Sequence, residues 1–152
     1  MYSLTEAEFF NKLLDNNIDI FCDIRRRRGV RGARYSFVNS LRLQKKLREL
    51  NINYFHFLEF SPSKEIREKQ KEEDKKLKIM KRERTSLGET FINSFIDDNL
   101  IDDNISAFNN TIGENAENVV LFCVELEPKA CHRSLVAEAL FNQNPEIKVI
   151  HL

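Results

Sequence analysis

One short motif near the end of the chain combines a thiol, an imidazole and a guanidinium. It reads Cys131-His132-Arg133-Ser134 and lies at the predicted start of a helix. Unpaired backbone amides at such a position favour an anion and lower the pKa of a thiol. The motif therefore predicts either an anion-binding site, in which Arg133 grips the ligand with two hydrogen bonds, or a nucleophilic Cys131 with His132 as acid or base. A purely structural role, with Arg133 paired to Glu125 or Asp23, stays open.

A second group of residues is strongly basic. Six arginines occur between residues 25 and 34, and residues 24–48 hold ten lysines or arginines and no acid. Residues 89–127 hold nine acids and no base, although the net charge of the whole chain is zero. The basic block predicts a surface for phosphate or nucleic acid, with Tyr35 or Phe37 as a stacking face. The alternative is that the two blocks neutralise each other in the fold.

Three apolar, β-branched runs at residues 18–24, 52–57 and 119–124 predict strands, and helical patterns separate them. This alternation predicts a parallel sheet, and ligands of open parallel sheets bind outside the carboxyl ends of the strands. Asp23 and Arg25 end the first run, His56 lies near the end of the second, and Glu125 follows the third. We expect these side chains to share one site, in which Asp23 and Glu125 position guanidiniums or act as acid or base.

The predicted fold class is α/β, a three-layer sandwich with a mainly parallel sheet of about four or five strands. The final residues, 148–152, are expected to form the last strand. We predict a single α/β domain over residues 1–152, with a charged, exposed helical excursion at about 62–86.

Composition excludes several classes of protein. No apolar run approaches the roughly 20 residues of a membrane span, and the start does not have the pattern of a secretory signal. Three cysteines do not suit a disulfide framework, which indicates a reducing, cytoplasmic location. Cys22 and Cys123 are expected to pack in the core. The spacing of Cys123, Cys131 and His132 matches no standard zinc pattern, so neither a metal nor another cofactor is expected.

The chain resembles the domain-of-unknown-function family 488, a set of small α/β proteins. The residues that carry the resemblance are Asp23-Ile24-Arg25, Arg27-Arg28-Gly29-Val30-Arg31-Gly32, Tyr35-Ser36-Phe37-Val38-Asn39-Ser40, Leu43-Gln44, Leu47, Ile52-Asn53-Tyr54-Phe55-His56, Phe122-Cys123-Val124-Glu125 and Pro128-Lys129-Ala130-Cys131-His132-Arg133-Ser134-Leu135-Val136-Ala137. The resemblance implies an α/β fold and a shared polar site at Asp23, Arg25, Glu125, Cys131, His132 and Arg133, without an established reaction. Family members often begin with a strand before the first helix, and this sequence starts almost directly at that helix, which predicts a smaller sheet, an altered site or less activity.

The leading functional prediction is an anionic ligand, a nucleotide or nucleic acid, bound at the carboxyl ends of the strands. Its binding residues would be Arg25, Arg27, Arg28, Arg31, Arg133, Ser134 and His56. One alternative is a thiol-dependent transferase or hydrolase with the catalytic residues Cys131, His132, Glu125 and Asp23. Another is an interaction module whose basic loop meets an acidic partner or a second copy of the chain.

Overall fold

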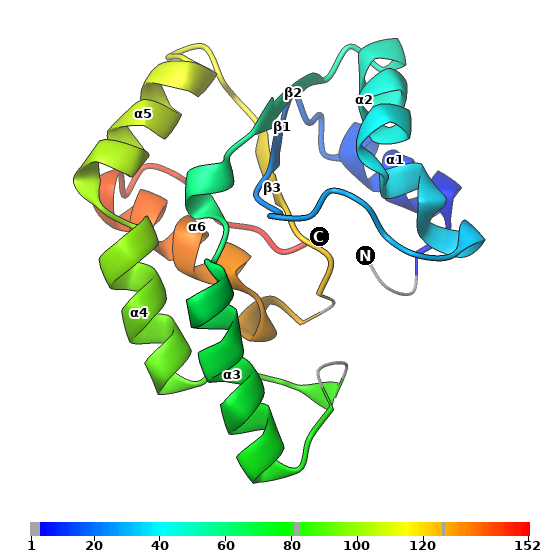
Figure 1. Cartoon of the computed structure of the whole chain (residues 1–152). Helices are drawn as coiled ribbons and strands as arrows, with labels where there is room; N and C mark the ends of the chain where they lie inside the picture. The colour runs from blue at the N-terminus through cyan, green and yellow to red at the C-terminus, as the bar shows by residue number, and fades with distance from the viewer. Residues whose placement is uncertain (1–3, 81–82, 126) are drawn as a thin grey trace.

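Three parallel strands form the centre of the protein. The computed structural model describes residues 4–80, 83–125 and 127–152. Strands β1 (Ile20–Asp23), β2 (Asn53–His56) and β3 (Val119–Phe122) pair in the order β2-β1-β3 (Figure 1). The central strand is buried along its whole length, as expected of a parallel strand covered on both faces. The mixed α/β architecture with parallel strands is therefore confirmed.

The described residues contribute three strands to the sheet, fewer than the four or five expected from the sequence. Residues 148–152 form no strand. Their apolar side chains are partly exposed, and residues 145–149 line a surface hollow with Ser134, Ala137 and Glu138 of the last helix. Local strand propensity does not decide pairing by itself, and here the segment lies against a helix instead of beside an edge strand of the sheet.

One face of the sheet is covered by helices α1 (Glu6–Asp15) and α2 (Ser40–Glu49). A capping box begins α1, because Thr5 and Glu8 exchange hydrogen bonds between side chain and backbone. The core on this side is rich in phenylalanine and contains Phe9, Phe10, Leu13, Phe21, Phe37, Val38, Leu43, Leu47, Ile52 and Phe122. A short 3-10 helix, η1 (Ala33–Val38), leads into α2.

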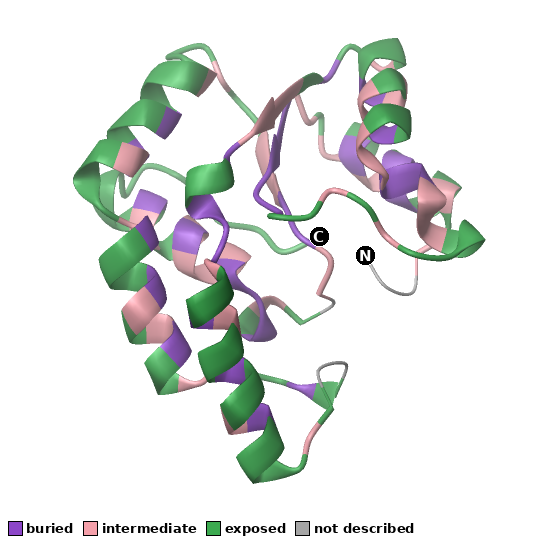
Figure 2. Cartoon of the chain, viewed as in Figure 1, coloured by how far each residue is buried: buried purple, intermediate pink, exposed green. Residues whose placement is uncertain are grey.

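The opposite face is covered by α4 (Glu89–Asn99), α5 (Asp102–Ile112) and α6 (His132–Gln143). Successive strand side chains point to opposite faces, so Ile20, Cys22 and Ile24 lie on this side while Phe21 lies on the other. Short 3-10 helices, η2 (Leu58–Phe60) and η4 (Pro128–Ala130), follow the ends of β2 and β3. Figure 2 shows the buried residues along the strands and on the inward faces of the helices.

The charged segment after β2 forms helix α3 (Lys64–Leu77), which packs against α4. The helix is exposed on most of its surface, but Ile66, Gln70 and Asp74 form one buried stripe at four-residue spacing. Residues 81 and 82 of the predicted excursion lie outside the described residues. Among the described helices, none is both long enough and apolar enough to cross a membrane.

Candidate functional site

A buried acid–guanidinium cluster occupies the end of β1 on the face covered by α1 and α2. The Asp23 carboxylate is fully buried and accepts two bonds from the Arg25 side chain, from Nε at 2.8 Å and from Nη2 at 2.7 Å. Tyr54 of β2 donates its hydroxyl to the same carboxylate at 2.9 Å, and Arg28 lies 3.5 Å from that hydroxyl. We call Asp23, Arg25, Arg28 and Tyr54 the acid–guanidinium cluster.

The Arg25 side chain is buried and bonds other groups inside the protein. Its side chain is 3% exposed, donates to the Val38 carbonyl at 3.0 Å and lies 4.6 Å from the centre of the Phe122 ring. Its backbone carbonyl accepts a hydrogen bond from His56 Nε2 at 2.9 Å. The guanidinium therefore anchors the first turn after β1, and His56 stabilises the same turn.

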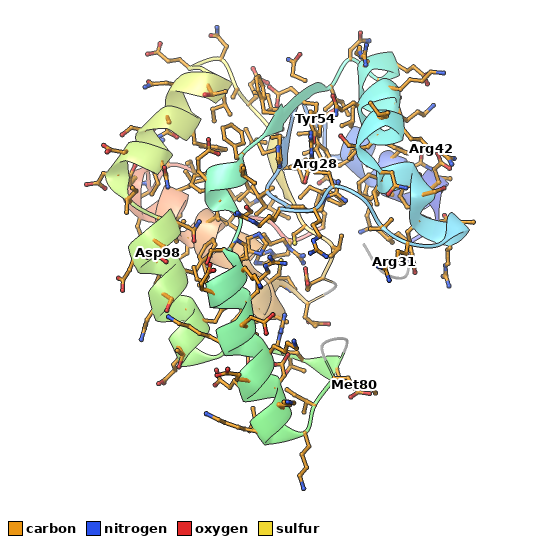
Figure 3. All side chains as sticks on the ribbon, in the orientation of Figure 1. Arg28, Arg31, Arg42, Tyr54, Met80 and Asp98 are labelled. Atoms are coloured by element: carbon orange, nitrogen blue, oxygen red, sulfur yellow. The ribbon has the colours of Figure 1, made fainter. Side chains whose placement is uncertain are left out.

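The rest of the basic run forms an exposed loop, residues 26–34, which we call the arginine loop. Arg26, Arg27, Arg31 and Arg34 are exposed, and Arg28 is half-buried. Hydrogen bonds from Val30 N to Asn39 Oδ1 and from Ser40 N to the Arg28 carbonyl fix the loop against the start of α2. Figure 3 places Arg28 beside Tyr54 near the strands and Arg31 farther out along the loop. Phe37 is buried and cannot stack on a ligand, whereas Tyr35 is half-exposed.

A second polar cluster lies on the other face, between the end of β3 and the start of α6. Cys123, Glu125, Cys131 and His132 form it, and we call it the thiol–imidazole cluster. The Glu125 Oε2 atom is 3.0 Å from Cys123 Sγ and 3.7 Å from Cys131 Sγ. The sulfur atoms of Cys123 and Cys131 and a ring nitrogen of His132 all lie within 4.8 Å of one another. Cys131 is 1% exposed, Cys123 7% and His132 8%.

The two thiols have opposite proton affinities. Hydrogen bonds from Cys123 and then from His132 hold the pKa of Cys131 well below its ordinary value. The pKa of Cys123 is raised by its bond to Cys131, by burial and by the Glu125 carboxylate. Burial alone would lower the pKa of His132, but the bond to Cys131 and its charge raise the pKa above the ordinary value. Cys131 is therefore the thiol that ionises first, stabilised by two neighbouring donors.

Main-chain contacts hold the remaining motif residues in place. Arg133 donates from Nη1 to the Glu125 carbonyl at 2.6 Å, and the Ser134 hydroxyl donates to the Cys131 carbonyl at 2.9 Å. Arg133 thus bonds the main chain of Glu125, which is one of the two residues expected to pair with Arg133 if the motif is purely structural. The predicted roles of Arg133 and Ser134 in ligand binding stay predictions.

The two clusters meet at the end of β1 but lie on opposite faces of it. His132 Nε2 donates to the Ile24 carbonyl at 3.1 Å, and the next carbonyl, that of Arg25, accepts from His56. The expected convergence of distant segments is present in the backbone. The Arg25 guanidinium, however, contacts Phe122 and Val38 of one core, while Cys123 and Cys131 belong to the other. The residues predicted as one site are thus divided into two neighbouring clusters.

Two contributors were not expected from the sequence. Tyr54 completes the acid–guanidinium cluster. It pairs with Phe21, two residues before Asp23, so strand alternation places the Tyr54 and Asp23 side chains on the same face of the sheet once the pairing is known. Arg84, at the end of the charged excursion, forms a buried ion pair with Asp74 at 3.0 Å and donates to the Ala130 carbonyl at 3.2 Å. The excursion is therefore fastened to the turn that carries Cys131.

Comparison with known proteins gives a family and no activity. The model of the family described as a domain of unknown function, DUF488, matches residues 5–140. The chain belongs to the DUF488 family. The DUF488 match extends from the start of α1 through most of α6 and includes both clusters. No curated protein and no solved structure matches the chain.

Proposed function

We propose that the protein binds a phosphate-rich polyanion, a nucleic acid, through the arginine loop. The observation that carries the proposal is the state of Arg27 and Arg31. Both are exposed, and within the described part of the chain neither has an ion-pair or hydrogen-bond partner. Unpaired guanidiniums on a surface bind phosphate oxygens and release counterions from a nucleic acid.

The local charge supports this proposal. Residues 24–48 contain no acid, so the sequence around the loop offers no internal counter-charge. Among the described residues, Asp23 pairs with Arg25, Glu6 with Arg42 and Glu49 with Lys46, and none of these acids pairs with Arg27 or Arg31. The arginine loop therefore keeps a positive potential that attracts an anionic ligand.

The anchoring of the loop also supports it. The buried Asp23–Arg25 pair fixes one end, and the bonds of Val30 and Ser40 fix the middle and the return to α2. Gly32 has a φ of 91°, a conformation that glycine adopts without strain, where the chain turns back. A loop that is already shaped loses less entropy when it binds.

A polyanion fits better than a single small phosphate. Arg27 and Arg31 are four residues apart on an exposed loop, and a ligand with several phosphates can engage both. Tyr35 lies next to Arg34, whose guanidinium is 5.3 Å from the ring centre, and a half-exposed ring of this kind can stack on a base.

The proposal extends to the setting of the protein. Helices on both faces of the sheet support a three-layer arrangement.

Cys22, Cys123 and Cys131 are free thiols, and the sulfur atoms of Cys123 and Cys131 lie close together. Neighbouring thiols persist in a reducing compartment, so we place the protein in the cytoplasm.

The test is binding of a fluorescent single-stranded oligonucleotide, followed by anisotropy. The variant Arg27→Ala/Arg31→Ala should bind about tenfold more weakly at moderate salt, since two phosphate contacts are lost. The matched control is Lys75→Ala/Lys76→Ala, which removes the same charge from exposed positions in α3. Equal weakening in both variants would show that the net charge of the protein, and not the arginine loop, accounts for the loss of binding. Unchanged binding by the arginine variant would exclude the arginine loop as the binding surface.

A further inference from the structure

The thiol–imidazole cluster has the composition of a metal site. Cys123 comes from the end of β3, Cys131 is the N-cap of α6, and His132 is the first residue of that helix. Cys131 has an extended backbone, with φ −135° and ψ 136°, and its sulfur lies within 4.8 Å of a ring nitrogen of His132. We propose that Cys123, Cys131 and His132 bind one Zn²⁺ ion, with the Glu125 carboxylate as the fourth ligand.

The separations of the donor atoms fit a tetrahedral ion. Bonds of about 2.3 Å to sulfur and about 2.0 Å to nitrogen place the donors of a tetrahedral zinc ion roughly 3.3–3.8 Å apart. The three donors here lie within 4.8 Å of one another. Binding an ion therefore requires these donors to approach one another by no more than about 1.5 Å.

His132 already has the hydrogen bond that a metal-bound histidine requires. A histidine ligand commonly donates its second ring N–H to a carbonyl, which fixes the tautomer and the ring orientation. Nε2 of His132 donates to the Ile24 carbonyl at 3.1 Å. Nδ1 is therefore the atom that carries the lone pair toward the two sulfur atoms.

Glu125 supplies the fourth donor. Its Oε2 atom lies 3.0 Å from one sulfur and 3.7 Å from the other, while the group of donors within 4.8 Å of one another contains only Cys123, Cys131 and His132. The carboxylate must therefore approach the His132 ring to complete the tetrahedron. Two thiolates, an imidazole and a carboxylate match the mixed sulfur, nitrogen and oxygen sets that zinc accepts, whereas Mg²⁺ and Ca²⁺ prefer oxygen alone.

Two guanidiniums fix the main chain around this donor set. Arg133 bonds the Glu125 carbonyl, and Arg84, which is paired with Asp74, bonds the Ala130 carbonyl one residue before Cys131. The donors come from a strand end and a helix start, held together by the buried contacts of α6. Sequence spacing gave no zinc pattern because the site depends on this meeting of two elements.

The first test is metal binding by the full chain. Protein purified in a reductant, stripped with a chelator and titrated with Zn²⁺ should bind one equivalent. Titration with Co²⁺ should give the thiolate-to-cobalt absorption and the strong visible bands of a tetrahedral site. Absence of stoichiometric Zn²⁺ binding, or a Co²⁺ spectrum without the thiolate band, would overturn the proposal.

Substitutions then assign the ligands. Cys131→Ser and His132→Gln should each weaken Zn²⁺ binding by more than about 100-fold, since changes even to residues behind the ligands cost 10- to 100-fold. Cys22→Ala is the matched control, because Cys22 is a buried thiol outside the cluster, and it should bind Zn²⁺ like the parent.

A measurement on the unaltered chain covers variants that fail to fold. Zn²⁺ should protect Cys123 and Cys131 from slow alkylation, as read by mass spectrometry, and leave the alkylation of Cys22 unchanged. Rapid alkylation of Cys131 that Zn²⁺ does not slow would contradict the metal site and favour a nucleophilic thiol.

Discussion

The two polar clusters meet at the end of β1, where His132 bonds the Ile24 carbonyl and Arg25 begins the arginine loop, yet they differ in kind. In the acid–guanidinium cluster, one buried carboxylate accepts bonds from the Arg25 side chain and from Tyr54, so its charge is compensated inside the protein. The thiol–imidazole cluster instead gathers two thiols, an imidazole and a carboxylate, and the donor atoms of Cys123, Cys131 and His132 lie within 4.8 Å of one another. The first cluster fastens a loop, and the second is the proposed metal site.

The acid–guanidinium cluster positions other residues, whereas the thiol–imidazole cluster contains the groups that can react or bind an ion. Arg25 and Asp23 hold the start of the arginine loop, so that Arg27 and Arg31 are exposed in a defined place. The Ile24 carbonyl beside them orients His132 in the other cluster. The end of β1 therefore organises both faces while exposing none of its own side chains.

The largest expected effect comes from breaking the acid–guanidinium cluster. Asp23→Ala leaves the buried Arg25 guanidinium without its carboxylate, and the free energy of unfolding should fall by about 3–5 kcal/mol in urea denaturation. Glu6→Ala is the matched control, because it breaks the exposed pair with Arg42 and should change stability by about 1 kcal/mol at most. Equal losses in the two variants would show that burial adds nothing to the Asp23–Arg25 pair.

The thiol–imidazole cluster should respond to metal and the acid–guanidinium cluster should not. At a free Zn²⁺ concentration 100 times the Kd, the parent chain should gain about 2.7 kcal/mol of stability. Cys131→Ser should gain almost nothing, while Tyr54→Phe should gain as much as the parent. Thermal unfolding with and without Zn²⁺ measures these gains, and a gain retained by Cys131→Ser would argue against that ligand.

A smaller effect is expected at the edge of the acid–guanidinium cluster. Tyr54→Phe removes one hydrogen bond to Asp23 and should cost about 1 kcal/mol near neutral pH. Burial raises the pKa of Tyr54 above its ordinary value, and the Asp23 carboxylate adds to the rise. This stabilising contribution is complete below the ordinary tyrosine pKa and is lost as pH rises through the higher folded value.

Unfolding measured from neutral to strongly alkaline pH tests this sign. The difference between the parent and Tyr54→Phe should shrink as pH rises. A difference that grows with pH would contradict the assigned direction of the shift.

Much of the fold could be predicted from local patterns. The apolar runs that became β1, β2 and β3, the capping box at Thr5 and the helices around Phe91 and Phe108 follow from periodicity and capping. Residues 148–152 did not form the expected strand, because the segment packs near α6 and not beside an edge strand, a choice that local sequence does not reveal. The buried stripe of α3 was hidden because Gln70 and Asp74 are polar and are buried through their bonds to each other and to Arg84.

The sequence predicted that the candidate site residues lie at the ends of the strands, but not on which face of the sheet each side chain lies. Asp23, Arg25, Glu125, Cys131 and His132 do lie around the ends of the strands, as parallel topology requires. Alternation of side chains along β1 then directs Asp23 to one core and Ile24 to the other, so one expected site became two clusters. Cys123 was expected to be plain core, and only the fold brings its sulfur to Cys131 and His132.

The salt dependence of oligonucleotide binding tests the proposed function most directly. For the parent chain, the logarithm of the association constant should fall linearly with the logarithm of salt concentration. In Arg27→Ala/Arg31→Ala that slope should shrink by about 1.4, which is two contacts at about 0.7 each for a single strand. An association that does not depend on salt, or a slope that stays the same in the variant, would contradict phosphate binding by the arginine loop.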